Sequence, residues 1–139
     1  MVWQVVVMVT DGAHQQWALN LLLNLHSLDI HHSLVIASSA SVCRSLHFRL
    51  LSSNIRVGGH CAHSSFLQAR SNGKVAAGLR RWGINNDHVF HLWWQRWRCM
   101  GLAAALGYNM LNLDTDISLR ADPYPILKRA SLQHVMSRG

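Results

Sequence analysis

Short apolar runs alternate along this chain with segments whose hydrophobic residues recur at helical spacing. The runs "WQVVVMVT" at 3–10 and "SLVIA" at 33–37 are typical of strands that are buried on both faces. A helical period at 13–28 separates them. Parallel strands need such crossover connections, so the order predicts an α/β fold: a Rossmann-like, mostly parallel sheet with helices on both faces.

The same two patterns continue toward the C-terminus. Residues 58–74 are mostly Gly, His, Ser and Asn and are predicted to form a loop, followed by a weak helical segment at 74–82. In the helix at 13–28, a stripe that begins at Trp17 is expected to face the core. Further helices are expected at 38–51, at 89–106 and from Asp122 onward, and further strands at 55–57 and 108–113.

Three helix ends carry recognisable signals. Asp11 is positioned to cap the helix at 13–28, and a serine begins the helix at 38–51. Gly107 supplies the left-handed position that ends the helix at 89–106. These signals support the same order of elements within one domain.

The chain has 139 residues, a net charge of +7 and no Glu. A charge of this sign favours an anionic partner, but the Lys and Arg residues are scattered, which argues against a dedicated nucleic-acid groove. The longest uninterrupted apolar run, at 5–9, is far shorter than the ~20 residues that a membrane span needs. No signal peptide is expected either.

Three cysteines without a CxxC pair predict no disulfide framework, and leave open one bridge plus a free thiol. His60, Cys61 and His63 form the cluster "HCAH". It is either a zinc ligand set or part of a polar, His-rich loop. A second ligand pair at zinc-finger spacing is missing, which favours the loop.

Two carboxylates follow the strand expected at 108–113 directly, in "NLDTDI". Ligands of open α/β sheets bind beyond the carboxyl ends of the strands, which is where Asp114 and Asp116 fall. Their alternate positions point them to one side of the strand. Paired carboxylates suit a hard cation such as Mg²⁺ or Mn²⁺ that bridges to phosphate oxygens. The alternative is a polar turn without a ligand.

The segment "WQRWRCMGLAAALGYNMLNLDTDISLRADPYPILK" at 94–128 resembles the core of the nucleotide-diphospho-sugar transferase family of plants and green algae. The family pattern contains "LGYNVL", then "DTDV", then "DPY". The segments "VVVMVTDGAHQQWALNLLLNL" and "SLVIA" are similar to its first strand and helix and its second strand. The resemblance covers 3–37 and 92–128 well and the middle of the chain poorly.

The resemblance implies a retaining, metal-dependent glycosyltransferase with a GT-A fold that works in the Golgi lumen. Such an enzyme transfers arabinose, xylose or galactose from a UDP-sugar to a cell-wall or extracellular glycan or glycoprotein. Asp116 would bind Mn²⁺ or Mg²⁺, and Asp114 would hold donor hydroxyls or join the metal site. Thr10 and Asp11 would lie against the nucleoside, Asp11 in addition to its capping role or instead of it.

Arg96 and Arg98 lie two apart on the helix expected at 89–106, so at most one of them faces a diphosphate. We favour Arg98 for that role, with a surface position as the alternative for either. The neighbouring tryptophans are expected to pack rather than to form sugar platforms, and they are Trp93, Trp94 and Trp97.

Members of the family continue well beyond the "DPY" segment, and residues 129–139 do not follow the family pattern. We therefore expect residues 1–139 to form a single, partial nucleotide-sugar-binding domain that is incomplete at the C-terminus. Two other functions stay open. One is an inactive transferase fragment, and the other is a basic, non-catalytic α/β module that binds nucleic acid or another polyanion.

Overall fold

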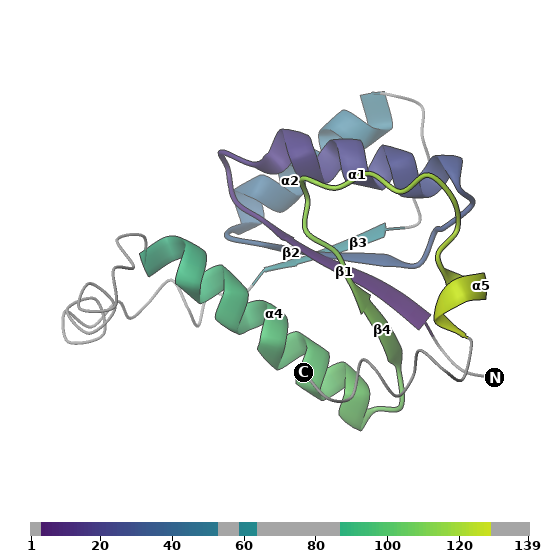
Figure 1. The fold of residues 1–139 in the computed structure, drawn as a ribbon. Helices are drawn as coiled ribbons and strands as arrows, with labels where there is room; N and C mark the ends of the chain where they lie inside the picture. Colours follow the sequence, from purple (N-terminus) through teal and green to yellow (C-terminus); the bar gives the residue numbers. More distant parts are fainter. Residues whose placement is uncertain (1–3, 53–58, 64–86, 129–139) are drawn as a thin grey trace.

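The computed structural model describes residues 4–52, 59–63 and 87–128, which form a sheet with helices on both faces (Figure 1). The strands and helices alternate as the sequence predicts. In chain order they are β1 (Gln4–Thr10), α1 (Gln15–Ser27), β2 (Ser33–Ala37), α2 (Ala40–Ser52), β3 (Gly59–His63), α4 (Asp87–Ala105), β4 (Asn109–Asn112) and α5 (Tyr124–Leu127).

Within the described residues the sheet has four strands in the order β3-β2-β1-β4, and every neighbouring pair is parallel. The chain runs outward from β1 to β2 and β3, then returns through α4 to place β4 on the other side of β1. Val6 sits at the centre of this arrangement, in register with Ser33 of β2 and Leu111 of β4. The predicted parallel α/β architecture is therefore confirmed.

Alternate residues of the strands face two different layers. On one face, Val6 and Met8 of β1 and Leu113 after β4 share a core with the apolar faces of α1 and α2. Val7 and Ile36 are buried as well, and the helix that packs against the strands on their face is α4. Both faces of β1 are thus covered, which explains why its sequence is an unbroken apolar run.

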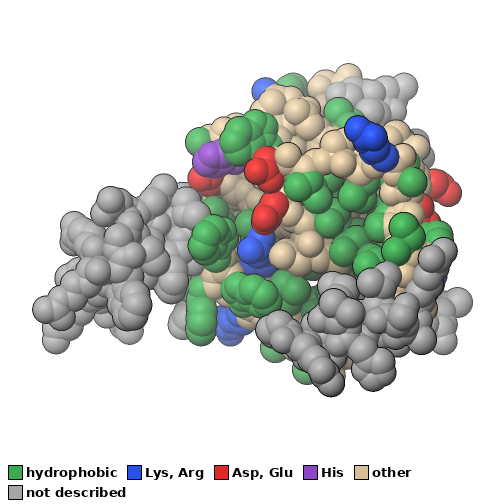
Figure 2. All heavy atoms as spheres, viewed as in Figure 1, with side chains coloured by type: hydrophobic (Ala, Val, Ile, Leu, Met, Phe, Trp, Pro, Cys, Tyr) green, Lys and Arg blue, Asp and Glu red, His purple; other side chains and the backbone are tan. Residues whose placement is uncertain are grey.

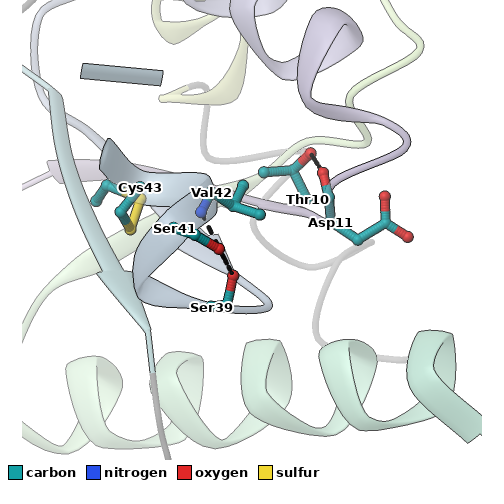
Figure 3. Close-up of a disulfide and its surroundings, with 7 residues drawn as sticks. Thr10, Asp11, Ser39, Ser41, Val42 and Cys43 are labelled. Atoms are coloured by element: carbon teal, nitrogen blue, oxygen red, sulfur yellow. Dashed lines mark hydrogen bonds between the residues drawn. A yellow bond between two sulfur atoms is a disulfide. The ribbon is translucent and has the colours of Figure 1, made fainter. Parts of the chain in front are cut away.

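The predicted helix-end signals are found at α2 and α4, whereas the N-cap of α5 is Pro123 and not Asp122. Ser39 begins α2: its Oγ accepts a hydrogen bond of 3.4 Å from the backbone N–H of Val42 (Figure 3). α4 ends at Ala105, and Gly107, two residues later, has φ +82°. The backbone N–H of Tyr108 donates to the carbonyl of Ala103. Asp122 precedes α5 and accepts from the N–H of Tyr124 at 2.9 Å.

The strand β3 corrects the prediction of a loop at 58–74, because residues 59–63 pair with β2 over its whole length. Cys61 within it forms a disulfide with Cys43 of α2, the helix shown in Figure 3. This bond rules out a zinc-bound thiolate at Cys61, while Cys99 is a free thiol. The strand predicted at 55–57 and the helical segment at 74–82 lie outside the described residues.

None of the helices in the described part of the chain is both long enough and apolar enough to cross a membrane.

Candidate functional site at the carboxyl edge of the sheet

The strand order reverses between β1 and β4, and a cavity of about 290 Å³ opens at that point. β1 leads to strands on one side and β4 lies on the other, so the loops that leave these two strands diverge and leave a crevice between them. The carboxyl ends of both strands contribute to its wall. The lining residues are Val9, Thr10, Asp11, His14, Trp17, Leu92, Trp93, Asp114, Thr115 and Asp116.

The carboxylate of Asp114 forms an ion pair with an arginine of α4. Arg96 projects from the buried side of α4, and its Nη1 donates to Asp114 Oδ1 at 2.7 Å. The Arg96 side chain is only 10% exposed, whereas that of Asp114 is 68% exposed. Arg96 therefore fixes one carboxylate oxygen while the rest of the group stays open to the cavity. On the face shown in Figure 2, acidic and basic side chains gather between hydrophobic ones.

Asp116 lies two residues further along, in the turn that follows β4, and is exposed to solvent. The backbone N–H of Ile117 donates to the carbonyl of Asp114 at 3.4 Å. Asn24 of α1 then anchors this segment: its Nδ2 donates to the carbonyl of Leu119 at 3.0 Å, and its Oδ1 accepts from the N–H of Leu119 at 2.7 Å. The segment that carries both carboxylates is thus tied to α4 at one end and to α1 at the other.

Asp11 joins the site from the end of β1. Its Oδ1 accepts from the backbone N–H of His14 at 2.8 Å and lies 2.7 Å from Nδ1 of the same histidine. The side chain therefore holds the turn that leads into α1. It does not cap the helix as predicted, because the N-cap of α1 is His14, which makes no side-chain capping bond. Thr10 is buried and donates from its hydroxyl to the carbonyl of Asp11 at 3.3 Å (Figure 3).

The aromatic walls of the cavity differ from the prediction. Trp17 was expected in the core, but it is about half exposed (49%) and its ring lies 4.9 Å from that of His14. Trp93, Trp94 and Trp97 are also about half exposed rather than packed. Of these three, only Trp93 lines the cavity. The helix period placed Trp17 on the apolar stripe. In the fold Trp17 lies at one side of that stripe, and α1 turns this side toward the cavity instead of the sheet.

Of the site residues expected from the sequence, Thr10, Asp11, Asp114 and Asp116 meet at this one cavity. Arg98 does not line it, since it lies on the exposed side of α4. The arginine that reaches the acidic pair is Arg96. Its position four residues after Leu92 on the buried stripe of α4 is the signal that identifies it.

The donor set suits a hard cation better than a soft one. The cavity offers carboxylate oxygens, while no group of three or more His, Cys, Asp or Glu in the described ranges is arranged to hold a metal. Mg²⁺ and Mn²⁺ are commonly bound through one or two carboxylates, with water and phosphate oxygens as the remaining ligands. Asp116 and the outer carboxylate oxygen of Asp114 fit this mode of binding.

Three groups beyond the acidic pair complete the site and carry no obvious mark in the sequence. His14 and Trp17 reach it because α1 begins directly at the crevice. Asn24 lies about two turns after Trp17 on α1 and contributes through its hydrogen bond to Leu119. The general rule that ligands bind where the strand order reverses would have pointed to the start of α1, but not to Asn24.

No protein-family model, curated protein or solved structure matches this chain.

Proposed function

We propose that this chain binds a nucleoside-diphosphate sugar, with UDP as the nucleotide, through a divalent cation at the carboxyl edge of its sheet. The chain would then be the donor-binding part of a glycosyltransferase with a GT-A type of fold. The observation that carries the proposal is the convergence of Thr10, Asp11, Asp114 and Asp116 on one cavity where the strand order reverses. A crevice of this kind is the usual nucleotide site of an open parallel sheet.

The proposed roles follow from the position of each side chain. Asp116 and the outer oxygen of Asp114 would hold Mn²⁺ or Mg²⁺. Bound there, the cation would neutralise charge on the diphosphate as the sugar departs. Thr10 and Asp11, at the end of β1, would contact the nucleoside. Trp17 and Trp93 supply apolar walls that a uracil or a sugar ring can pack against.

The "DTD" and "DPY" segments support the transferase assignment through their similarity to the nucleotide-diphospho-sugar transferases of plants and green algae. By that similarity the donor sugar would be arabinose, xylose or galactose. The acceptor would be a cell-wall or extracellular glycan or glycoprotein, and the compartment the Golgi lumen. The proposal assigns binding roles to the cavity residues and leaves catalysis to the positioning of donor and acceptor.

The direct test is calorimetric titration of the chain with UDP in the presence and absence of Mn²⁺. We expect binding that requires Mn²⁺ and that disappears in Asp116→Asn, because the substitution removes a cation ligand while keeping the size of the side chain. Asp29→Asn is the matched control. It removes an exposed carboxylate that precedes β2, at the other edge of the sheet, and should leave UDP binding intact.

UDP affinity that is the same with and without the metal, or that survives Asp116→Asn unchanged, would overturn the proposal. Turnover of labelled UDP-sugars, with hydrolysis counted as well as transfer, then distinguishes an active transferase from a chain that only binds the donor.

A further inference from the structure

Two histidines meet at the edge of the sheet opposite the proposed donor site. His26 lies in the last turn of α1, and His31 lies just before β2. Their Nδ1 atoms are 3.3 Å apart, and their rings meet edge to face with centroids 5.0 Å apart. This contact is a hydrogen bond between the two ring nitrogens, so one Nδ1 donates its proton and the lone pair of the other accepts it.

Backbone hydrogen bonds in the turn between His26 and His31 fix the relative position of the two side chains. The N–H of Ile30 donates to the carbonyl of Leu25, and the N–H of Asp29 donates to the carbonyl of His26. This pair of bonds is a Schellman ending, and buried Leu25 and Ile30 provide the apolar residues that accompany it. The spacing between His26 and His31 is therefore set by a closed turn and not by a free loop.

Asp29 occupies the left-handed position of this turn, with φ +60°. Glycine is the usual residue there, because a side chain costs about 1 kcal/mol or more in this conformation. The Asp29 carboxylate reaches His31 Nε2 at 2.7 Å. A carboxylate only accepts, so Nε2 of the neutral ring carries the proton and the lone pair of Nδ1 points toward His26.

This is the arrangement that orients a metal-binding histidine: one nitrogen donates to a carboxylate and the other faces the metal. With metal–nitrogen distances of about 2.0–2.1 Å, two nitrogens 3.3 Å apart subtend about 105° at a shared ion, close to the tetrahedral angle. The position of His26 at the end of α1 also favours a bound metal ion, because a helix C-terminus carries a partial negative charge that attracts cations.

We propose that His26 and His31 form a binding site for a borderline divalent cation such as Zn²⁺ or Cu²⁺, oriented by Asp29. The two Nδ1 atoms supply two ligands, and water completes the coordination. His26 places its own ring proton on Nε2 when the ion binds, so no net proton is released. The ion would clamp the end of α1 to the start of β2. The site is independent of the proposed donor site, which prefers oxygen ligands and harder cations.

The test is calorimetric titration of the full chain with Zn²⁺ and, separately, Cu²⁺ in a non-coordinating buffer. We expect His31→Ala and His26→Ala each to lose one equivalent of bound ion relative to the unsubstituted chain. Asp29→Asn should keep that equivalent but weaken it about tenfold or more, as loss of an orienting carboxylate does. Cu²⁺ should bind this site more tightly than Zn²⁺.

Two substitutions serve as controls. His47→Ala removes an exposed histidine of α2 and should lose no equivalent. Asp116→Asn should abolish UDP binding with Mn²⁺ while leaving this Zn²⁺ equivalent in place, so the two proposals fail separately. Nitrogen-15 NMR of the imidazoles checks the ligands directly. Equal stoichiometry and affinity in His31→Ala and the unsubstituted chain, or ring signals of His26 and His31 that do not respond to Zn²⁺, would overturn the site.

Discussion

Arg96 is buried on α4, yet its guanidinium reaches a carboxylate that is mostly open to solvent. Its Nε atom is buried and finds no hydrogen-bond partner among the described residues. Burying a cation in this way costs free energy that one ion pair with a solvated partner does not fully return. A cation buried in this way points to a role in the site: it orients Asp114 and offsets its negative charge.

The substitution Arg96→Met tests that role. Without the guanidinium, Asp114 and Asp116 present their full charge, so affinity for Mn²⁺ alone should rise, by about tenfold or ~1.4 kcal/mol. Affinity for UDP in the presence of Mn²⁺ should fall instead, because Asp114 is no longer held and a positive charge near the diphosphate is lost. Calorimetry of the two titrations measures both changes.

Stability should hardly change in Arg96→Met, since Met fills much of the same volume and leaves no buried polar atom. Arg44→Met is the matched control: it removes an exposed arginine of α2, so neither affinity should move. A parallel loss of Mn²⁺ and UDP binding in Arg96→Met, together with a lower melting temperature, would indicate a purely structural role.

Tyr124 gives a second prediction for a single residue. Burial, reinforced by the charge of Asp122, raises the pKa of Tyr124 to about 12. Folding thus favours the neutral phenol, whose oxygen lies 2.8 Å from His32 Nε2. The resulting stabilisation is fully present below the ordinary pKa of 10.0 and is lost as the pH rises from about 10 to about 12.

Ultraviolet titration of tyrosinate checks this prediction, because the chain contains only two tyrosines. We expect one of them to ionise near pH 12, and Tyr124→Phe to remove that late transition. The loss of stability between pH 10 and 12 should become smaller in the same variant. Persistence of the late transition in Tyr124→Phe would show that the shifted group is a different one.

At the scale of helices and strands, the site depends on how α1 and α4 grip the segment that follows β4. Arg96 of α4 binds Asp114 at the start of this segment, and Asn24 of α1 binds Leu119 further along it. The amide of Asn24 makes both a donated and an accepted bond to the same residue, which copies the pairing between neighbouring strands. The segment with the two carboxylates is therefore hydrogen-bonded to α4 at one end and to α1 at the other.

Asn24→Ala removes both bonds of this anchor. We expect the free energy of unfolding to fall by about 1–3 kcal/mol, because a part-buried carbonyl and N–H lose their partners. UDP affinity with Mn²⁺ should fall as well, since Asp116 lies on the released segment. Denaturant titration and calorimetry measure the two effects. Asn20→Ala, at an exposed position of the same helix, should change neither; an equal effect there would contradict the anchoring role.

The sequence predicts the long, periodic elements of this fold well. Six elements begin and end within a few residues of their expected positions: β1, α1, β2, α2, α4 and β4. They were predictable because buried residues recur at the period of a helix or a strand, and this spacing is visible in the sequence. β3 was missed because its "GHCAH" sequence has low strand propensity. Its pairing with β2 and the Cys43–Cys61 bond are tertiary contacts that no local pattern contains.

The same limit applies to the site. Asp114 and Asp116 were predictable because they follow an apolar strand directly. The sequence favoured Arg98 over Arg96, whereas the arginine that contacts the acidic pair is Arg96. A charged side chain can lie on the buried side of a helix when its end reaches a carboxylate, and the spacing of the two arginines does not reveal this. Asn24 is 95 residues from Leu119 in sequence, so only the folded topology connects them.

For the whole molecule, topology and charge favour different kinds of ligand. The sheet order creates a crevice with an acidic wall, whereas the net charge of +7 attracts any polyanion without a defined site. Binding that depends on the crevice should be specific and tied to a cation. Binding that depends on net charge should be diffuse and should weaken as salt screens it.

Random-sequence DNA and UDP therefore provide a comparison that separates these two modes. DNA affinity should fall steeply with salt concentration, because each phosphate contact releases counterions, and it should be the same in Asp116→Asn and the unsubstituted chain. UDP affinity with Mn²⁺ should change far less over the same salt range, yet vanish in Asp116→Asn. Fluorescence titration at about 50 and 200 mM salt measures both. Two results would mean that the basic surface and the crevice are one polyanion site: displacement of UDP by DNA, or weaker DNA binding in Asp116→Asn than in the unsubstituted chain. Either result would overturn the donor-binding proposal.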